Sequence, residues 1–276
     1  MTPKGRPPVP DIALDRSPAD ADAAPRPPWN GRLFLVLWGA GTISGLALAP
    51  VLVMASEAGL REEKIGWGMA ILASFLGPAV LYAVAVFIGL RLGPRLGLRA
   101  PLVEGWLAGR PVAAGPALGL GAIAGGVLGL AGVALSALLA GATARAAPGG
   151  EVMPAWTGLA NAVSAGIGEE LLFRLGLMSL VAWLAARLLP GTDGAPTPLG
   201  MWLAIGVTAI LFELTHIDPP AEITQVAALA ASALQAMRIT LAVALGWLFW
   251  RRGLEAAMAA HFTYNMILFY GVVAVL

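Results

Sequence analysis

Seven long apolar segments constrain the fold of this chain more than any other feature of its sequence. A helix that crosses a hydrocarbon layer needs about 20 mostly apolar residues. Hydrophobic residues make up 58% of the 276 residues and charged ones only 12%, against about 25% charged in a typical soluble domain. The sequence therefore predicts an all-α, polytopic transmembrane helical bundle, with about seven spans near 33–55, 67–90, 111–140, 156–189, 200–217, 235–250 and 254–276.

Three further stretches differ in character from an ordinary span. Residues 1–30 hold eight of the 21 prolines and too few apolar residues to offset the entropy of ordering. We therefore expect a disordered tail before a transmembrane domain at 31–276. Residues 218–234 start at a Pro-Pro pair, so we expect an interfacial or partly re-entrant helix before the sixth span. The third span carries Gly121, Gly125 and Gly129, whose spacing favours close helix packing, within the chain or against another copy.

Charge and composition exclude some classes of protein and predict an orientation. The formal net charge is +1 with no basic patch, which argues against a nucleic-acid partner. The chain has no cysteine, which excludes disulfides and thiolate metal sites. Twelve Lys and Arg residues fall on the N-terminal side of the predicted topology and three on the other. The positive-inside rule then predicts a multi-pass cell-membrane protein with a cytoplasmic N-terminus.

The fourth span contains charges that an apolar helix would not carry without a reason. The stretch GIGEELLFRLG places Glu169, Glu170 and Arg174 within six residues, and each charge at the bilayer centre costs about 2.5–3.5 kcal/mol on insertion scales. Glu170 precedes Arg174 by four residues, the favoured order for an ion pair on a helix. Glu169 is rotated by about 100° from its neighbour, which leaves it freer to face a cavity. Gly166 and Gly168 leave room beside it for backbone, water or substrate.

Two later spans repeat polar or aromatic residues at a spacing of four, which places them on one helix face. Phe212 precedes His216, and His261 precedes Asn265, each by four residues. Polar side chains within membrane spans usually face the interior of the bundle. We therefore expect a polar cavity inside the membrane.

These side chains could act in either of two ways. Glu169, His216 and His261 supply a general base and hydrogen-bond donors for a developing oxyanion. The same three residues are also a plausible metal set of one carboxylate and two imidazoles. The HExxH motif of soluble metalloproteases is absent, so no cofactor is expected, although zinc stays open. Glu213 and Arg238 are two further charges in apolar surroundings. They could pair across helices, or the Arg238 side chain could extend to the membrane interface.

The motifs together resemble the CPBP family, which comprises CAAX prenyl proteases of the Ras-converting type and the bacteriocin-processing or immunity proteins of the Abi family. They read EELLFR at 169–174, FELTH at 212–216 and HFTYN at 261–265. The resemblance covers about 156–270 and rests on the order of the three motifs in apolar segments.

The resemblance implies an intramembrane endopeptidase that acts on a peptide or lipidated protein substrate, including prenylated CAAX-type proteins. It implies that Glu169 and His216 activate the attacking water and that His261 and Asn265 stabilise the oxyanion. Glu170 and Arg174 match the remaining positions of the first motif, and Phe212 matches an aromatic position that we expect to contact substrate. The family is described both as metal-dependent and as metal-free, and we favour the glutamate type.

Two other readings remain open from the sequence. A proton-coupled transporter would use the membrane carboxylates and histidines as a relay, but no internal repeat is evident. A non-catalytic membrane scaffold or immunity protein would retain the motif without hydrolysing peptides.

Overall fold

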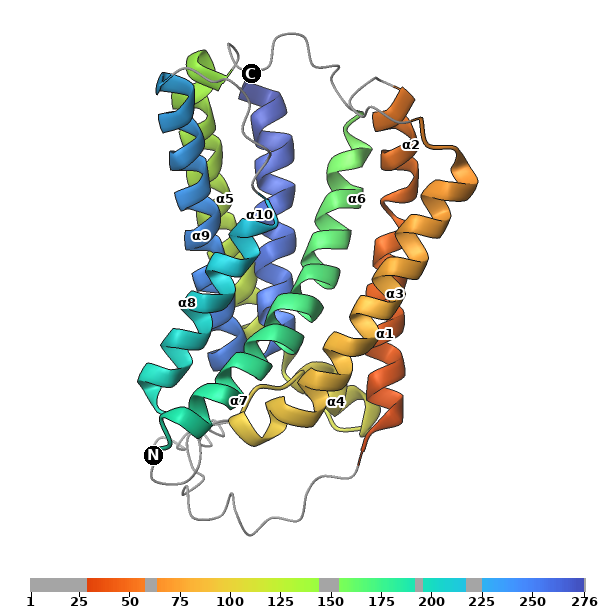
Figure 1. Ribbon diagram of the computed structural model, residues 1–276, viewed down its shortest axis with the longest axis vertical. Coiled ribbons are helices and arrows are strands. Elements are labelled where there is room, and N and C mark those ends of the chain that lie inside the picture. Colours follow the sequence, from red (N-terminus) through yellow and green to blue (C-terminus); the bar gives the residue numbers. More distant parts are fainter. Residues whose placement is uncertain (1–28, 58–63, 144–153, 192–195, 217–224, 276) are drawn as a thin grey trace, which may run out of the picture.

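The structure, a computed structural model, describes residues 29–57, 64–143, 154–191, 196–216 and 225–275. Within these residues the chain is a bundle of helices and contains no β-strand (Figure 1). Apart from its last two residues, the predicted tail at 1–30 lies outside the described part of the chain. The elements are α1 Gly31–Leu46, α2 Ala49–Glu57, α3 Trp67–Leu92, η2 Gly93–Leu96, α4 Pro101–Leu107, α5 Ala114–Thr143, α6 Trp156–Ser164, η3 Ala165–Met178, α7 Ser179–Leu188, α8 Pro198–Leu214, α9 Gln225–Arg252 and α10 Leu254–Val275.

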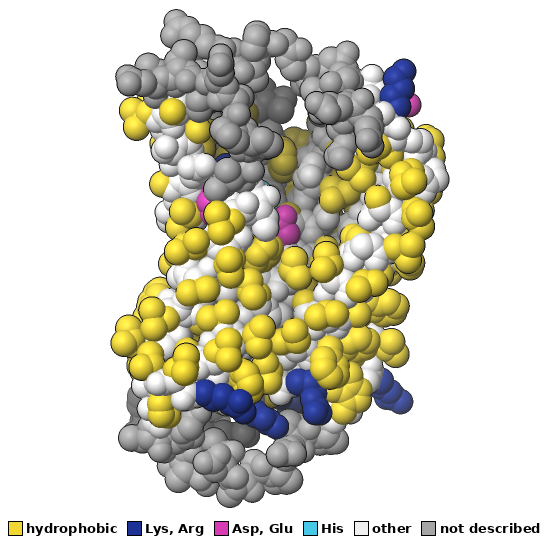
Figure 2. All heavy atoms as spheres, in the orientation of Figure 1, with side chains coloured by type: hydrophobic (Ala, Val, Ile, Leu, Met, Phe, Trp, Pro, Cys, Tyr) yellow, Lys and Arg dark blue, Asp and Glu magenta, His cyan; other side chains and the backbone are white. Residues whose placement is uncertain are grey.

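The helices confirm an all-α membrane bundle. Five helical stretches among the described residues are long and apolar enough to span a membrane: Gly31–Glu57, Trp67–Leu96, Ala114–Ala140, Trp156–Leu188 and Ala228–Arg252. The other two predicted spans correspond to α8, which has 17 residues, and to α10, which carries the polar residues of the third motif. Figure 2 shows a mostly apolar outer surface between the two ends of the molecule, as expected for contact with lipid.

The prediction of a separate helix at 218–234 is wrong for the residues that the structure describes. Helix α9 begins at Gln225 and continues without a break to Arg252. The segment 225–234 is rich in alanine, a strong helix former, and nothing in it interrupts the helix. The Pro-Pro pair at 219–220 lies outside the described residues.

The fourth predicted span is one continuous helical rod of three parts, α6, η3 and α7 (Figure 1). Its central part, η3, has the wider turns of a π-helix, a rare geometry that is frequent at functional sites. The rod contacts α3 on one side and α10 on the other. Small residues allow the approach to α3, because Gly89 packs on Leu175 and Gly176 packs on Ala85. The charged motif is therefore held between two groups of helices.

The glycines of α5 pack within the chain, as one of the two sequence alternatives proposed. A side chain at Gly121 would meet the backbone of Ala256, and one at Gly125 would meet the backbone of Ala260. Because Ala260 directly precedes His261, this close contact fixes the height and rotation of the helix that carries the third motif.

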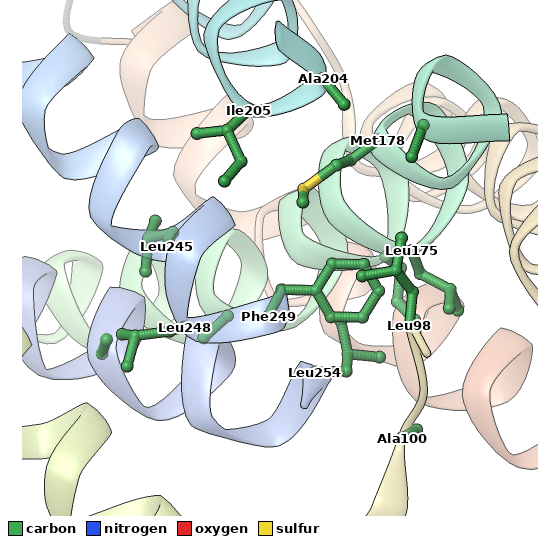
Figure 3. Packing of buried hydrophobic residues seen from close by; sticks show 14 of the residues in the cluster. Leu98, Ala100, Leu175, Met178, Ala204, Ile205, Leu245, Leu248, Phe249 and Leu254 are labelled. Carbon is green, nitrogen blue, oxygen red and sulfur yellow. The ribbon is translucent and has the colours of Figure 1, made fainter. Parts of the chain in front are cut away.

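A hydrophobic core joins η3 to α8, α9 and other helices of the bundle (Figure 3). Leu175 and Met178 of the rod lie beside Ile205 of α8, Leu245 and Phe249 of α9 in this cluster. These side chains are at most 1% exposed, so the core fixes α8 and α9 against η3. This packing places the second motif, at the end of α8, beside the first motif, on η3.

Candidate active site

The three motifs meet at one cavity of about 560 Å³. Glu169 of η3, His216 after α8, and His261 and Asn265 of α10 all line it. Figure 2 shows acidic side chains at mid-height among apolar surfaces, on the face that it displays. A cavity that contains the predicted polar residues is therefore present, although most of its wall is apolar. The short inclined helix α8 brings the second motif to the third.

Glu170 is the buried centre of the site. Its side chain is fully buried, and its Oε1 atom lies 3.1 Å from Nη1 of Arg174. This ion pair confirms the pairing that the four-residue spacing predicted. The same Oε1 lies 2.8 Å from Nδ1 of His261, a partner that the sequence did not reveal. The carboxylate thus links η3 to α10 and neutralises the guanidinium.

Arg174 is held by three kinds of contact. Besides the ion pair with Glu170, its Nη2 donates to the carbonyl oxygen of Ala242 at 3.2 Å. Its guanidinium carbon lies 5.0 Å from the centre of the Phe212 ring, within the range of a cation–π contact. Arg174 therefore ties η3 to α8 and α9, and it lies behind the cavity rather than in its wall.

Glu169 is the accessible carboxylate, as its rotation from Glu170 predicted. Its side chain is 31% exposed, and its Oε2 lies 3.9 Å from Nε2 of His261. The space beside the neighbouring glycines is occupied by other residues of the chain and is not open to water or substrate. Gly168 packs on the hydroxyl of Tyr82, and Gly166 packs on Phe262. These contacts fix the backbone on both sides of the site.

His261 lies between the two carboxylates, which restricts its proton positions. An ionised Glu170 can only accept, so Nδ1 must donate to it. In the neutral ring Nε2 is then an acceptor, and only the doubly protonated ring presents an Nε2–H to the cavity. The His261 side chain is buried. A group in the cavity can reach its ring at Nε2, on the side where Glu169 lies.

Phe212 organises the aromatic side of the site. Its ring lies 4.6 Å from the His216 ring and 6.1 Å from the His261 ring, measured between centroids. It also makes an edge contact with Phe173 at 5.1 Å. Because Phe212 is only 2% exposed, its evident contribution is to position the two histidines, and substrate contact stays a prediction.

His216 lies just beyond the last residue of α8 and is exposed. Its Nδ1 is 2.9 Å from the Phe212 carbonyl oxygen and 3.2 Å from Oγ1 of Thr215. Donation from Nδ1 to that carbonyl would fix the ring and leave Nε2 as a lone-pair acceptor. The local chain thus orients the imidazole at the cavity wall.

A second ion pair forms part of the cavity wall. Arg238 donates from Nε to Glu213 Oε2 at 2.9 Å and from Nη2 to Oε1 at 2.6 Å. This confirms the pairing across helices that the sequence left open. Arg238 lines the cavity, as do Tyr264 and Asn161. The last two were missed, although Tyr264 follows His261 by three residues and so shares its helix face.

The alternative metal set is not assembled among the described residues. No group of three His, Asp or Glu side chains there is close enough to hold a metal ion. The Nδ1 of His216 and the Nδ1 of His261 are both engaged with protein oxygens.

One comparison with known proteins finds a matching family model. The model of the Rce1-like type II CAAX prenyl endopeptidases matches residues 151–267. No curated protein and no solved structure matches the chain. The matched segment contains all three motifs and the helices that bring them together. This match, over residues 151–267, supports the CAAX-type intramembrane protease family that the three motifs resemble.

Proposed function

We propose that this protein is a glutamate-type intramembrane endopeptidase in which Glu169 and His216 activate the attacking water. The observation that carries the proposal is the convergence of Glu169, His216, His261 and Asn265 on one cavity inside an apolar bundle. The match to a peptidase family model agrees with it. A carboxylate that is accessible and yet close to a buried, oriented imidazole is suited to general-base chemistry.

The proposed reaction begins with water beside Glu169. The carboxylate takes a proton as the water oxygen bonds to the carbonyl carbon of the peptide, with His216 Nε2 accepting a hydrogen bond from that water. The carbonyl oxygen becomes an oxyanion, to which the Asn265 amide donates. The C–N bond then breaks, and the proton on Glu169 passes to the leaving nitrogen. The products are a carboxylic acid and an amine, and transfer of the acid proton to the amine gives a carboxylate and an ammonium group.

His261 has a conditional part in this scheme. Its Nε2 can donate to the oxyanion only when the ring carries both protons, because Nδ1 is committed to Glu170. Glu170 and Arg174 do not line the cavity. We therefore assign them a positioning role through His261, rather than contact with the substrate.

The substrate that we propose is a prenylated, CAAX-type peptide. The cavity wall combines the polar residues with a set of apolar side chains on α9 and α10, and that set can hold a lipid chain beside the scissile bond. Its members are Leu234, Met237, Leu241, Leu268 and Val272. A lipidated substrate would also be delivered from the bilayer that surrounds the bundle.

We further propose a cell-membrane location with the N-terminus in the cytoplasm. The described basic residues at the ends of α3, α7 and α9 include Arg91, Arg187 and Arg251. Figure 2 shows more basic side chains at the lower end of the apolar surface than at the upper end. Such an asymmetry supports the orientation predicted from the sequence.

The test of this function compares two peptides of identical sequence, one farnesylated on its CAAX cysteine and one not. The purified full chain in lipid nanodiscs is incubated with each, with and without a zinc chelator, and the products are identified by mass spectrometry. We expect cleavage after the modified cysteine, with preference for the farnesylated peptide and no effect of chelator. Cleavage that chelator abolishes would contradict the glutamate mechanism. Absence of cleavage of both peptides would contradict the proposed substrate.

A further inference from the structure

A second cavity, of about 410 Å³, lies where α1 begins and α3 ends. It shares no lining residue with the candidate active-site cavity. Its lining includes one carboxylate, Glu104, and four arginines: Arg91, Arg95, Arg99 and Arg110. It is therefore a distinct, basic site at the end of the bundle.

Among the described residues that line this cavity, the charges do not cancel. Oε2 of Glu104 lies 2.5 Å from Nη2 of Arg99, and its Oε1 accepts a hydrogen bond from the backbone nitrogen of Ala100 at 3.3 Å. One carboxylate thus neutralises one guanidinium, which leaves an excess of three positive charges from the remaining arginines that line the cavity. Clustered charge of one sign attracts the opposite charge, and the planar guanidinium fits phosphate oxygens in pairs.

The lining of the cavity also has an apolar and aromatic part. Trp29, Leu33 and Leu90 line it. The Trp29 ring lies 5.6 Å from Phe87, between centroids. Phe87 is 51% exposed on α3, a membrane-spanning helix by length and composition. An apolar strip therefore leads from the arginines onto the lipid-facing surface, with a tryptophan at the boundary, where this residue is common in membrane proteins.

We propose that this cavity binds the headgroup of an anionic glycerophospholipid. The phosphodiester would lie among Arg91, Arg95 and Arg110, and an acyl chain would lie along Trp29 and Phe87. A free phosphate would use the arginines but would leave the apolar strip without a function. The combination of the two surfaces in one cavity therefore favours a lipid over a soluble anion.

Lipid bound in this cavity would affect the active site indirectly, through the packing of helices. The lipid would join the start of α1 to the end of α3, and α3 supports η3 through the contact of Gly89 with Leu175. We therefore expect bound lipid to raise the thermal stability of the whole bundle.

The test uses the full chain in nanodiscs of zwitterionic phosphatidylcholine, into which phosphatidylglycerol is titrated. Native mass spectrometry counts the lipids that stay bound, and thermal unfolding gives the shift in Tm. The test variant is Arg91→Gln with Arg95→Gln. The matched control is Arg251→Gln with Arg252→Gln, because these exposed arginines end α9 and do not line the cavity.

We expect wild type and the control to retain phosphatidylglycerol and to gain in Tm. We expect the test variant to bind it about 30-fold more weakly, because it lacks two of the basic residues that would attract the anionic headgroup. Equal losses in the two variants would overturn the proposal in favour of diffuse surface charge. Equal stabilisation by soluble glycerol phosphate would overturn it in favour of a soluble anion, and equal retention of phosphatidylcholine would also contradict it.

Discussion

The Nδ1 atom of His261 lies 2.8 Å from Oε1 of Glu170, on a helix 91 residues earlier in the chain. The same oxygen lies 3.1 Å from Nη1 of Arg174. The two adjacent glutamates therefore have different environments: Glu170 is fully buried and orients the imidazole, while Glu169 is 31% exposed and faces the cavity. This division of roles underlies the predictions below.

Replacement of Glu170 by Gln should lower the free energy of unfolding by about 3–5 kcal/mol. The change leaves the Arg174 guanidinium buried without its counter-charge, which is the costly way to break a buried ion pair. Thermal or chemical unfolding in one detergent measures the difference. Glu169→Gln is the matched control on the next residue, and we expect it to cost less than about 1 kcal/mol. Equal losses in the two variants would contradict the division of roles.

Replacement of Gly125 by Ala should destabilise the bundle by about 1–3 kcal/mol, because the added methyl group meets the backbone of Ala260. Peptide hydrolysis should fall as well, since α10 must shift with His261. Gly119→Ala is the control on the same helix, where nothing lies within 4 Å of the added carbon. It should be neutral or slightly stabilising. Unfolding curves of the two variants measure their stabilities. Equal stability of the two variants would rule out this packing.

The ion pair of Glu213 with Arg238 should show a coupling energy of about 1–3 kcal/mol in a double-mutant cycle. Its geometry is bidentate, and the Glu213 side chain is only 6% exposed, whereas that of Arg238 is 31% exposed. The cycle uses Glu213→Gln, Arg238→Met and the double variant, each followed by unfolding. A coupling near zero, as for many exposed pairs, would mean that the pair does not fix α8 against α9.

Contacts that are local in sequence were the predictable part of the site. The ion pair of Glu170 with Arg174 follows from a spacing of four on one helix, and the accessible position of Glu169 follows from its rotation. The bond between Glu170 and His261 could not be predicted, because it depends on how two distant helices pack. The sequence does contain its cause, since Gly125 permits the close approach that sets the position of Ala260 and His261.

Helix geometry limited the prediction of the fold in two places. The wide turns of η3, and its contacts with α3 and α10, are not revealed by any periodicity of apolar residues. The helix expected at 218–234 was inferred from the Pro-Pro pair alone, but the alanine-rich residues from Gln225 onward simply extend the sixth helix. The predicted apolar spans otherwise correspond to helices, because long apolar runs leave a chain in lipid few alternatives.

The measurement that tests the central claim most directly is the kcat of wild type, Glu169→Gln and Glu169→Asp on the farnesylated CAAX peptide in nanodiscs. Loss of a general base typically lowers the rate by about 10²–10⁴-fold. We predict a loss in this range for the Gln variant, a smaller loss for the Asp variant, and unfolding curves close to wild type for both. A Gln variant that is folded and retains the wild-type kcat would contradict the assignment of Glu169 as the base.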